Sequence, residues 1–335
     1  MNTRTKIKAL AILLTLGIAF SGFADADFSQ LQKGVDDFSK ELAKSLPFNS
    51  ALGLNWSDAY IGKVFPSLPP HFGVGGSFGI TTMNLPVMNT LAGYLGYSFP
   101  FDISKLVLPA YAVEARMGGL FLPFDIGFKF GYLPPLGMWG SNLNMDYLSV
   151  GGDLRYAVLD LKLLKLSLGL GLNYLKGSVG GKVGTDHTIT FENLGVPDSI
   201  TLEKPDVSLQ WKTVSLDIKT QVSASLLIFT PYLGLGWSYA WSSAGYSVDS
   251  QVTRGGSPLN PGDFPAINSY LRGQGLKEID GDSAGISSII KNSGYNIRVF
   301  GGMSFNMMVF RFDLTGLYSF RDSNYGASFG FRFQL

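Results

Sequence analysis

The sequence contains no cysteine and only two histidines among its 335 residues. Without cysteine there is no disulfide, no lipid-modified amino-terminal cysteine and no zinc–thiolate site. Lys and Arg number 26 against 25 Asp and Glu, so there is no basic field to attract nucleic acid. We therefore expect no metal, no cofactor and no nucleic-acid partner.

A long apolar run is also missing beyond the first residues. Residues 1–26 carry Arg4, Lys6 and Lys8, then an apolar stretch and small residues, which is the anatomy of a secretory signal peptide. Beyond them, no window of about 18 apolar residues could cross a bilayer as a helix. Yet hydrophobic residues make up 46% of the chain and charged residues only 15%. This balance favours an exported protein, mature from near Asp27, that crosses a membrane as a β-barrel.

Alternating side chains support this interpretation. From Tyr325 to Leu335, large apolar residues occupy every second position and small or polar residues the others, as in a strand with one apolar face. In one such segment, Leu209 and Trp211 fall out of step with Val214, which predicts a β-bulge near Lys212. Ten segments alternate: 72–82, 113–121, 124–132, 148–156, 164–174, 209–222, 229–241, 294–306, 310–320 and 325–335.

The connections between these segments are alternately short and long. Short joins fall at 122–123, 159–162, 223–228 and 307–308, and longer ones at 83–109, 133–144, 175–206 and 242–293, with 321–324 as an exception. Outer-membrane barrels pair short periplasmic turns with long external loops. We therefore expect an all-β transmembrane protein, a closed antiparallel outer-membrane β-barrel of about ten strands, within a range of eight to fourteen. Both ends of the mature chain would be periplasmic, and 325–335 would pair with 72–82. The alternative is a soluble β-sandwich, which explains the aromatic face less well.

Two stretches resemble known proteins. Ser328, Gly330, Phe333 and Leu335 resemble the carboxyl-terminal signal of bacterial outer-membrane β-barrel proteins, although that family usually ends in Phe rather than Leu. The resemblance implies insertion by the barrel-assembly machinery into the bacterial outer membrane. The stretch Ser57–Gly76 is similar to uncharacterised spirochaete outer-membrane proteins.

The segment before the first strand has helical rather than strand spacing. Phe28, Leu31, Val35, Phe38, Leu42 and Leu46 recur every three or four residues, which predicts an amphipathic helix. Because lone amphipathic helices are marginal in water, its apolar stripe must be docked. The alternatives are a periplasmic cap or interfacial helix, a plug entering the lumen from below, and a partner-binding or disordered arm. The organisation is then 1–26 signal peptide, 27–70 helix and plug or cap segment, and 71–335 barrel.

The inward faces of the predicted strands are of two kinds. Segments 72–82, 164–174 and 229–241 turn Gly, Ser and Ala inward, which either forms a smooth binding wall or simply relieves crowding. The other strands bring charges inward, either as a rigid ladder of ion pairs between near neighbours or as a narrow, weakly anion-preferring path. The charged candidates are Glu114 with Arg116, Asp125 with Lys129, Asp153 with Arg155, Asp217 with Lys219, Arg311 with Asp313, and Lys165, Arg298 and Arg332.

Signals for catalysis are few. Asp186-His187 lies in a predicted external loop, where outer-membrane proteases of ten strands place acids and a His, but a single dipeptide is weak evidence and a solvated loop explains it better. Gly180-Gly181-Lys182 is followed by Val183 and does not make a phosphate loop.

The sequence favours a channel or transporter for small solutes, including hydrophobic ones, over an enzyme. Such a barrel could resemble the fatty-acid transporter family, which has more strands. The alternatives are a structural or surface-interaction barrel that acts through its loops and, third, an outer-membrane hydrolase. The expected partners are the lipid bilayer, the assembly machinery and a small-molecule solute; the sequence carries no signal for oligomeric state.

Overall fold

The computed structural model describes most of the chain beyond the predicted signal peptide. The described residues are 28–61, 71–87, 89, 104–118, 123–137, 143–161, 163–182, 186–193, 196–204, 206–254, 257–258, 265, 269 and 283–335. Several predicted features lie outside them: the signal peptide, the mature start at Asp27, the residues Pro69-Pro70 and, in the short join at 122–123, Leu122. None of the helices in the described ranges combines the length and the apolarity that a membrane-spanning helix requires.

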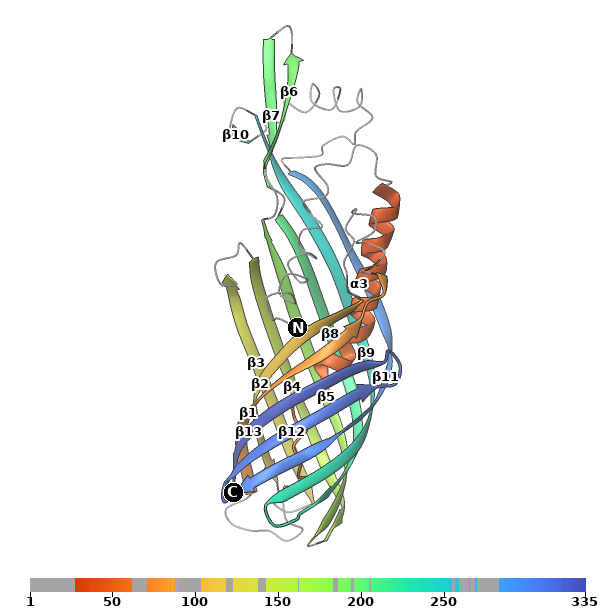
Figure 1. Ribbon diagram of the computed structural model, residues 1–335, viewed down its shortest axis with the longest axis vertical. Coiled ribbons are helices and arrows are strands. Elements are labelled where there is room, and N and C mark those ends of the chain that lie inside the picture. Colours follow the sequence, from red (N-terminus) through yellow and green to blue (C-terminus); the bar gives the residue numbers. More distant parts are fainter. Residues whose placement is uncertain are drawn as a thin grey trace.

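Ten strands form one closed antiparallel barrel (Figure 1). Each strand pairs with its neighbours in chain order, and β11 pairs with both β9 and β12. The ring is completed where β13 pairs with β1, from Gly73↔Gln334 to Thr81↔Gly326. The predicted barrel, its strand number and the pairing of 325–335 with 72–82 are therefore confirmed. The barrel strands are β1 (His71–Asn84), β2 (Lys105–Gly118), β3 (Phe124–Gly137), β4 (Leu143–Asp160), β5 (Leu164–Lys182), β8 (Asp206–Ala224), β9 (Phe229–Arg254), β11 (Ser283–Met307), β12 (Phe310–Ser319) and β13 (Asn324–Gln334).

The alternation along each strand places apolar side chains outside and small or polar ones inside. In β5, Leu168, Leu170 and Leu172 are more than half exposed, whereas Ser167 and Gly169 are buried. Such a surface is costly in water, because each exposed apolar side chain forgoes about 1.5–3 kcal/mol of burial energy. The same exposed apolar side chains occur around the barrel, among them Val74, Phe78, Val113, Phe128, Phe130, Leu154, Ile218, Leu235, Ile297, Met303, Leu314 and Phe329.

Several strands continue well past this apolar belt. β9 has 26 residues and β11 has 25, so at about 3.3 Å per residue each extends for roughly 80 Å. A hairpin of β6 (His187–Asn193) and β7 (Val196–Leu202) adds to β9, as does the short β10 (Ser257–Pro258). These extensions all lie at one end of the barrel, here called the long-connection end; the other is the short-turn end (Figure 1). Parts of 133–144, 175–206 and 242–293, predicted as loops, are thus strands.

The predicted bulge near Lys212 is absent. β8 pairs with β5 and with β9 without a shift through Lys212, which lies opposite Lys176 and Ser243. Leu209 and Trp211 are out of step because both point inward, where a helix covers them. The apolar face changes sides while the backbone stays regular. Register shifts occur elsewhere, between Leu133 and Leu136 in β3 and between Ala157 and Leu159 in β4.

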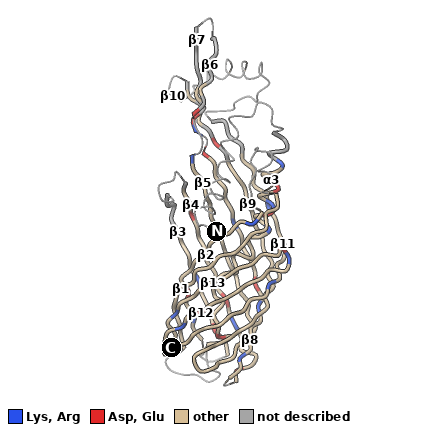
Figure 2. The backbone as a smooth tube through the Cα atoms, viewed as in Figure 1, with Lys and Arg blue, Asp and Glu red and all other residues tan. Residues whose placement is uncertain are grey.

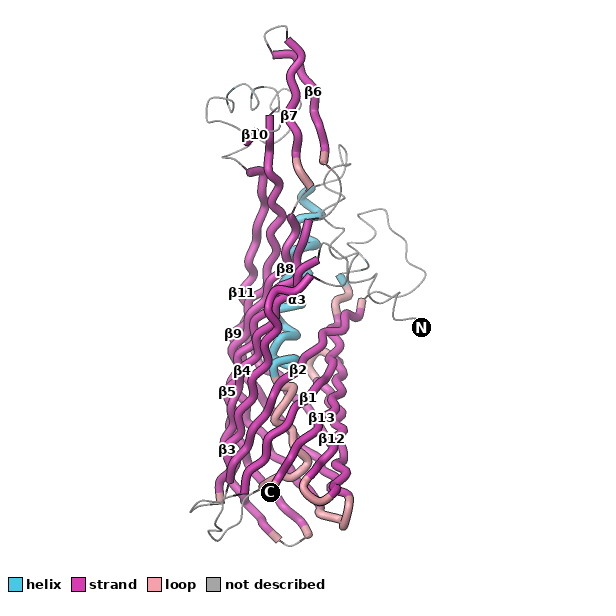
Figure 3. Tube along the Cα trace, turned by 90° about the vertical axis from the view of Figure 1, so that its left-hand side faces the viewer, coloured by secondary structure: helices cyan, strands magenta, loops and turns pink. Residues whose placement is uncertain are grey.

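The helix α3 (Phe28–Ser50) stands inside the barrel (Figure 3). Its lower half reaches the turn between β12 and β13, where Lys44 pairs with Asp322 at 2.7 Å. Residues 51–61 then descend to the short-turn end, where the carbonyl of Tyr60 accepts from Lys165. The chain therefore enters the lumen from the long-connection end, and the expectation of entry from below is wrong. Its described start lies at the end opposite His71 and Leu335, so the expected placement of both ends on one side is also wrong.

Candidate functional site: a lumen filled by the amino-terminal segment

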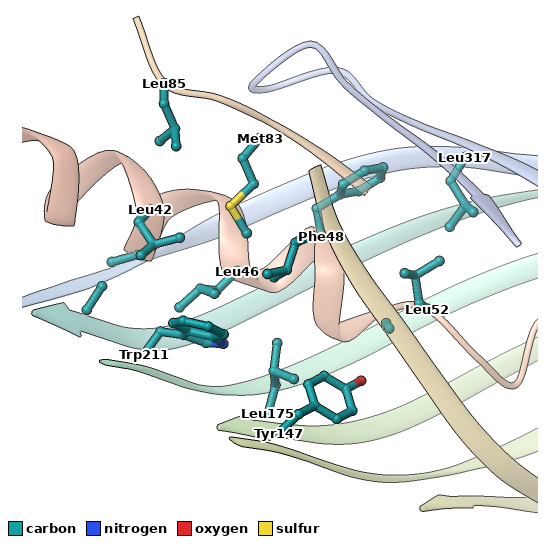
Figure 4. Packing of buried hydrophobic residues seen from close by; sticks show 14 of the residues in the cluster. Leu42, Leu46, Phe48, Leu52, Met83, Leu85, Tyr147, Leu175, Trp211 and Leu317 are labelled. Atoms are coloured by element: carbon teal, nitrogen blue, oxygen red, sulfur yellow. The ribbon is translucent and has the colours of Figure 1, made fainter. Parts of the chain in front are cut away.

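Residues 28–61, here called the plug segment, occupy the lumen in two parts. The upper part is α3, whose apolar stripe of Phe38, Leu42 and Leu46 is at most 2% exposed. The stripe contacts the inward side chains of Trp211, Phe300 and other apolar residues, so the hydrophobic core of this protein lies inside the barrel (Figure 4). The side chains of Phe28 and Leu31 lie outside the described residues. The core around the helix also contains Met83, Leu85, Leu108, Ala110, Tyr147, Leu175, Val179, Tyr232, Ala244 and Leu317.

The end of the helix is capped by the barrel wall. The last four carbonyls of a helix have no hydrogen-bond partner within the helix, so they need other donors and favour a nearby cation. Lys129 of β3 supplies both, because its Nζ donates to the carbonyls of Ser50 (2.7 Å) and Leu52 (2.5 Å). Gly53 follows with a φ of 86°, a left-handed conformation that glycine adopts without strain and that turns the chain downward. Lys129 thus fixes the height at which helix gives way to extended chain.

Below the helix, the lumen is polar and the plug segment is held mainly through its backbone carbonyls. Arg155 Nη1 donates to the carbonyl of Asp58 (2.7 Å), and Lys219 Nζ to that of Leu54 (3.0 Å). Gln221 donates to the carbonyl of Trp56 at 2.7 Å. Basic side chains of the wall therefore contact the plug segment at several levels. Figure 2 marks where basic and acidic residues lie along the strands of the barrel.

Trp56 is the aromatic anchor of this lower part. Two guanidinium groups lie over its ring, with Cζ of Arg332 at 4.5 Å and Cζ of Arg116 at 5.6 Å from the ring centroid. Its Nε1 donates to Glu114 Oε2 at 2.6 Å, and Glu114 also accepts from Ser77. The indole thus contacts two cations and has its N–H satisfied, which suits a buried Trp.

Asp58 is the only carboxylate that forms ion pairs from the lower plug segment, residues 51–61. Arg332 Nη2 donates to its Oδ2 at 2.8 Å, and Arg311 Nη1 lies 3.6 Å from the same oxygen. Burial alone would raise the pKa of Asp58, but Arg332, Arg311 and Lys165 together hold it below its ordinary value. Asp58 is thus an anion at neutral pH and offsets part of the positive excess of the wall.

The charges of the wall form a network that runs across strands. Asp125 binds Arg155 through both oxygens (2.8 and 2.7 Å) and Arg116 at 2.5 Å. Asp153 then joins Arg116 and Lys219, each at 2.6 Å. Arg298 forms a two-pronged pair with Asp217 (2.8 and 2.7 Å).

The same-strand pairs expected from the sequence are therefore replaced by pairs between strands. Residues two apart on a strand lie about 6.6 Å from each other, whereas directly opposed Cβ atoms on neighbouring strands are about 5 Å apart. Arg332, for example, pairs with Asp313 of β12 at 3.4 Å, and Asp125 pairs with Arg155 of β4 rather than with Lys129. Most of the predicted inward charges are buried; Lys165 and Arg311 are half-buried.

The inward glycines lie opposite long side chains of this network. A Cβ at Gly73 would come 2.8 Å from the ring of Trp56, and one at Gly236 would come 2.6 Å from Cζ of Arg298. The interpretation in which glycine relieves crowding therefore describes these positions better than an empty smooth wall. What remains beside Trp56 is a cavity of about 20 Å³, which holds about one water molecule.

The other sequence candidates take simpler positions. Asp186 accepts a hydrogen bond from the backbone of Lys204 (2.9 Å) and so joins the two ends of the β6–β7 hairpin; the side chain of His187 lies outside the described residues. Within the described ranges, no group of three or more His, Cys, Asp or Glu side chains could hold a metal ion. On β13, Ser328 and Gly330 face inward, while Phe333 lies at the short-turn end beside Phe310 and Phe72.

Trp56, Asp58, Tyr147 and Trp211 were not among the sequence candidates. The signal that could have found Trp56 and Asp58 is the stretch from Asn55 to Ile61, which overlaps the resemblance at Ser57–Gly76 and concentrates polar and aromatic residues ahead of the first strand.

Comparisons with known proteins add a general likeness. No family model matches the sequence, and a search of curated proteins finds no match. Among solved structures, the chain is similar to the outer membrane protease OmpT from Escherichia coli, with 11% identity over 80% of this chain and 98% of that chain and a TM-score of 0.37. The translocator domain of autotransporter NalP from Neisseria meningitidis gives 8% identity, 92% and 98% coverage and a TM-score of 0.31. The CymD monoaromatic hydrocarbon channel gives 9% identity, 87% and 92% coverage and a TM-score of 0.24.

Proposed function

We propose that this protein is an outer-membrane channel or transporter for small solutes, including hydrophobic ones, and that its plug segment holds the lumen closed. The observation that supports it is the composition of the lumen. Barrels of about this strand number are usually filled by their own inward side chains. Here the upper lumen is filled instead by a helix with side chains, an object about 10–12 Å across. Displacement of that segment should open the upper lumen to a solute.

The belt of exposed apolar side chains supports placement in the bilayer. Exposed Tyr and Trp side chains accompany the belt, and amphipathic rings of this kind suit the lipid–water interface. Tyr132, Trp241, Tyr295 and Tyr325 are each about half exposed. Because the long connections of outer-membrane barrels are external, the described start of α3 would then lie toward the cell exterior. We also propose that Ser328, Gly330, Phe333 and Leu335 serve as the signal for barrel assembly.

Conductance in planar lipid bilayers tests the channel proposal. A variant lacking residues 28–61 should carry current, whereas the full-length protein should be mostly silent. Ala59 N donates to Ser223 Oγ at 3.0 Å, so Ala59→Cys with Ser223→Cys should lock the plug segment to the wall in a chain that otherwise has no cysteine. The locked form should not open until it is reduced.

Folding controls accompany each form. Heat-dependent migration on gels shows whether the shortened barrel has folded, and Asp58→Asn in the full-length chain provides a loosened plug if it has not. A folded deletion variant that carries no current would overturn the channel proposal.

A second candidate is a surface-interaction barrel, which the protruding strands favour. The hairpin from His187 to Leu202 extends the sheet beyond the apolar belt, where it cannot contribute to a pore. Protease treatment of intact cells should release peptides from this hairpin and none from the belt. If the hairpin is protected on intact cells, it is not presented at the surface and this candidate fails.

A further inference from the structure

The turns at the short-turn end of the barrel are apolar. Leu227, in the turn between β8 and β9, and Met308, in the turn between β11 and β12, are fully exposed. These turns lie at the same end as the carboxyl terminus (Figure 1). Contiguous exposed apolar residues mark contact with a membrane or a protein. We call the exposed apolar residues of the short turns the rim: Leu161, Leu163, Leu226, Leu227, Ile228, Met307 and Met308.

The backbone of the two fully exposed residues makes their apolar character more informative. Leu227 has a φ of 44° and Met308 a φ of 52°, both in the left-handed region. Glycine, Asn and Asp adopt this conformation most readily, and larger residues seldom do. The turn geometry would therefore favour glycine or a polar residue at both positions, and contact with water would favour the same choice. Leu and Met at both positions indicate apolar surroundings.

The backbone of the rim is partly satisfied within the protein. In a hydrocarbon environment, backbone polar groups have no water to pair with and need partners in the protein. Leu226 and Phe229 exchange N–H to carbonyl hydrogen bonds across their turn, at 2.8 and 2.6 Å. Carbonyls of three short turns also accept from neighbouring strands: Leu163 from Ser225 N (2.8 Å), Ile228 from Asn306 N (2.7 Å) and Val309 from Gln334 N (2.8 Å).

The rim lacks the rings that mark a boundary with water. Tyr and Trp are enriched at lipid–water interfaces because one end of each ring system is polar. Neither residue occurs within two positions of any of the four short joins at 122–123, 159–162, 223–228 and 307–308. The exposed rings beside these turns belong instead to Phe229, Phe305 and Phe310, which have no polar atom.

Charged residues occur in one of the four short joins. The join at 159–162 contains Asp160 and Lys162, and the other three contain no charged residue. Asp160 lies 3.8 Å from Lys165, and both side chains are half-buried. A lysine at the edge of a membrane can extend its ammonium group toward the headgroups while its stem stays among acyl chains. One join therefore suits the headgroup boundary, and the others suit hydrocarbon.

The height of the apolar belt agrees with this placement. Along β9, exposed apolar residues run from Phe229, next to the turn, to Trp241. These twelve steps extend about 40 Å along the strand, or about 28 Å along the barrel axis at a tilt near 45°. The apolar band of outer-membrane barrels is about 25 Å tall. The belt thus fills the hydrocarbon only if it begins at the turns, with no polar margin beneath them.

We infer that the rim is a lipid-binding surface whose turns lie among the acyl chains just beneath the headgroups of the inner leaflet. The rim continues the apolar belt without interruption, and its occupant is therefore the same membrane lipid. This inference rests on the membrane placement and orientation proposed above. It adds that the short turns hold the barrel at a fixed depth and do not project into the periplasm.

Spin labelling of the full-length protein in vesicles of dimyristoylphosphatidylcholine tests the rim. Because the chain has no cysteine, Leu227→Cys and Met308→Cys each provide one site for a nitroxide. Relaxation by oxygen, which concentrates in hydrocarbon, is compared with relaxation by a nickel chelate, which stays in water. Leu170→Cys in the belt is the lipid reference, and Thr188→Cys in the protruding hairpin is the water reference. Both rim labels should give an oxygen-to-nickel ratio close to that of Leu170→Cys and several-fold above that of Thr188→Cys.

A second set of variants asks whether the apolar side chains hold the rim in lipid. Leu227→Asn with Met308→Asn suits the left-handed backbone, so the barrel should fold, and heat-dependent gel migration checks this. The ratio at a third rim site, Leu163→Cys, should then fall several-fold. Ile289→Asn replaces an exposed apolar residue in the extension of β11 and is the matched control, which should leave that ratio unchanged. An unchanged ratio in the double variant would overturn the inference.

The outcomes separate this inference from the proposed function. Strong relaxation of both rim labels by nickel, with Leu170→Cys still in lipid, would overturn the rim and leave the membrane placement intact. Rim labels protected from both reagents would also overturn it, because a protein surface, such as a second copy, would then cover the turns. Nickel access at Leu170→Cys would refute the membrane placement itself. None of these measurements depends on conductance, so a rim in lipid on a barrel that never conducts would support the inference and leave the channel refuted.

Discussion

Asp58→Asn offers the sharpest test of how the plug segment is held. The substitution removes the negative charge that faces Arg332 at 2.8 Å and Arg311 at 3.6 Å but preserves the size of the side chain. Removing one partner from a buried ion pair costs about 3–5 kcal/mol, because the remaining charge stays buried. The amide oxygen of Asn can still accept from Arg332, which recovers about 1 kcal/mol. We therefore expect a net loss of about 2–4 kcal/mol, worked from these two contributions.

Thiol labelling measures this loss directly. Ala59→Cys places a buried reporter next to Asp58 in a chain that has no other cysteine. If labelling requires the lower plug segment to leave the wall, a loss of 2–4 kcal/mol should speed it by about 30- to 1,000-fold. Heat-dependent gel migration checks that the barrel itself remains folded.

Lys44→Gln is the matched control in the same segment. Lys44 pairs with Asp322 at 2.7 Å, but its side chain is 42% exposed, and exposed pairs contribute only about 0–1 kcal/mol. Labelling of the Ala59→Cys reporter should therefore change by less than about tenfold. Equal effects of the two substitutions would refute the argument that burial and the positive wall make Asp58 the anchor.

The remaining predictions concern the helix, the lower anchor and the orientation. Trp211→Ala should lower the free energy of unfolding by about 3–5 kcal/mol, because the indole is buried against the helix, and denaturant titration in detergent measures it. Gly73→Val should displace the indole of the plug and raise thiol labelling, whereas Gly76→Val, with no atom nearer than 3.7 Å to its new Cβ, should not. The pKa of Asp58 is lower in the folded protein than in the unfolded chain, so its charge stabilises the plug at pH values above the unfolded pKa. This contribution should be lost as the pH falls through the folded pKa, and Asp58→Asn should remove that part of the acid dependence. An epitope inserted before Phe28 should bind antibody on intact cells; binding only after the outer membrane is opened would reverse the proposed orientation.

The barrel could be predicted from the sequence because lipid-facing and lumen-facing residues obey a period of two. Tyr325 to Leu335 shows this without interruption, and the structure places that stretch against β1. The same rule failed where the inner side is apolar. Leu209 and Trp211 look like residues of a bulge because α3 covers the inner face of β8 there, so that this face is as apolar as the outer one. The period of β8 alone does not reveal the helix.

Partners across the lumen could not be predicted, for a different physical reason. The strand that supplies the ion-pair partner of an inward charge depends on the shear of the barrel and on side-chain length. The local sequence pattern determines neither of them. Arg116 reaches Asp153 two strands away by extending over Gly127, where any Cβ would collide with the guanidinium. The strand predicted at 113–121 began too late, because residues 105–112 also belong to β2. Pro109 lies in that stretch, which pairs with β1 but for which no pairing with β3 is given in the described residues, and proline is tolerated at such an edge.

The pairing of Asp58 with Arg332 links residues 274 positions apart. Contacts of such separation form late, because the entropy of closing so long a loop must be overcome before the contact contributes any stability. Until β13 docks on β1, Arg332 is not held beside the position that Asp58 occupies. Closure of the wall therefore completes the site that anchors the plug segment, and loosening of the β13–β1 ladder should weaken the hold on the plug as well.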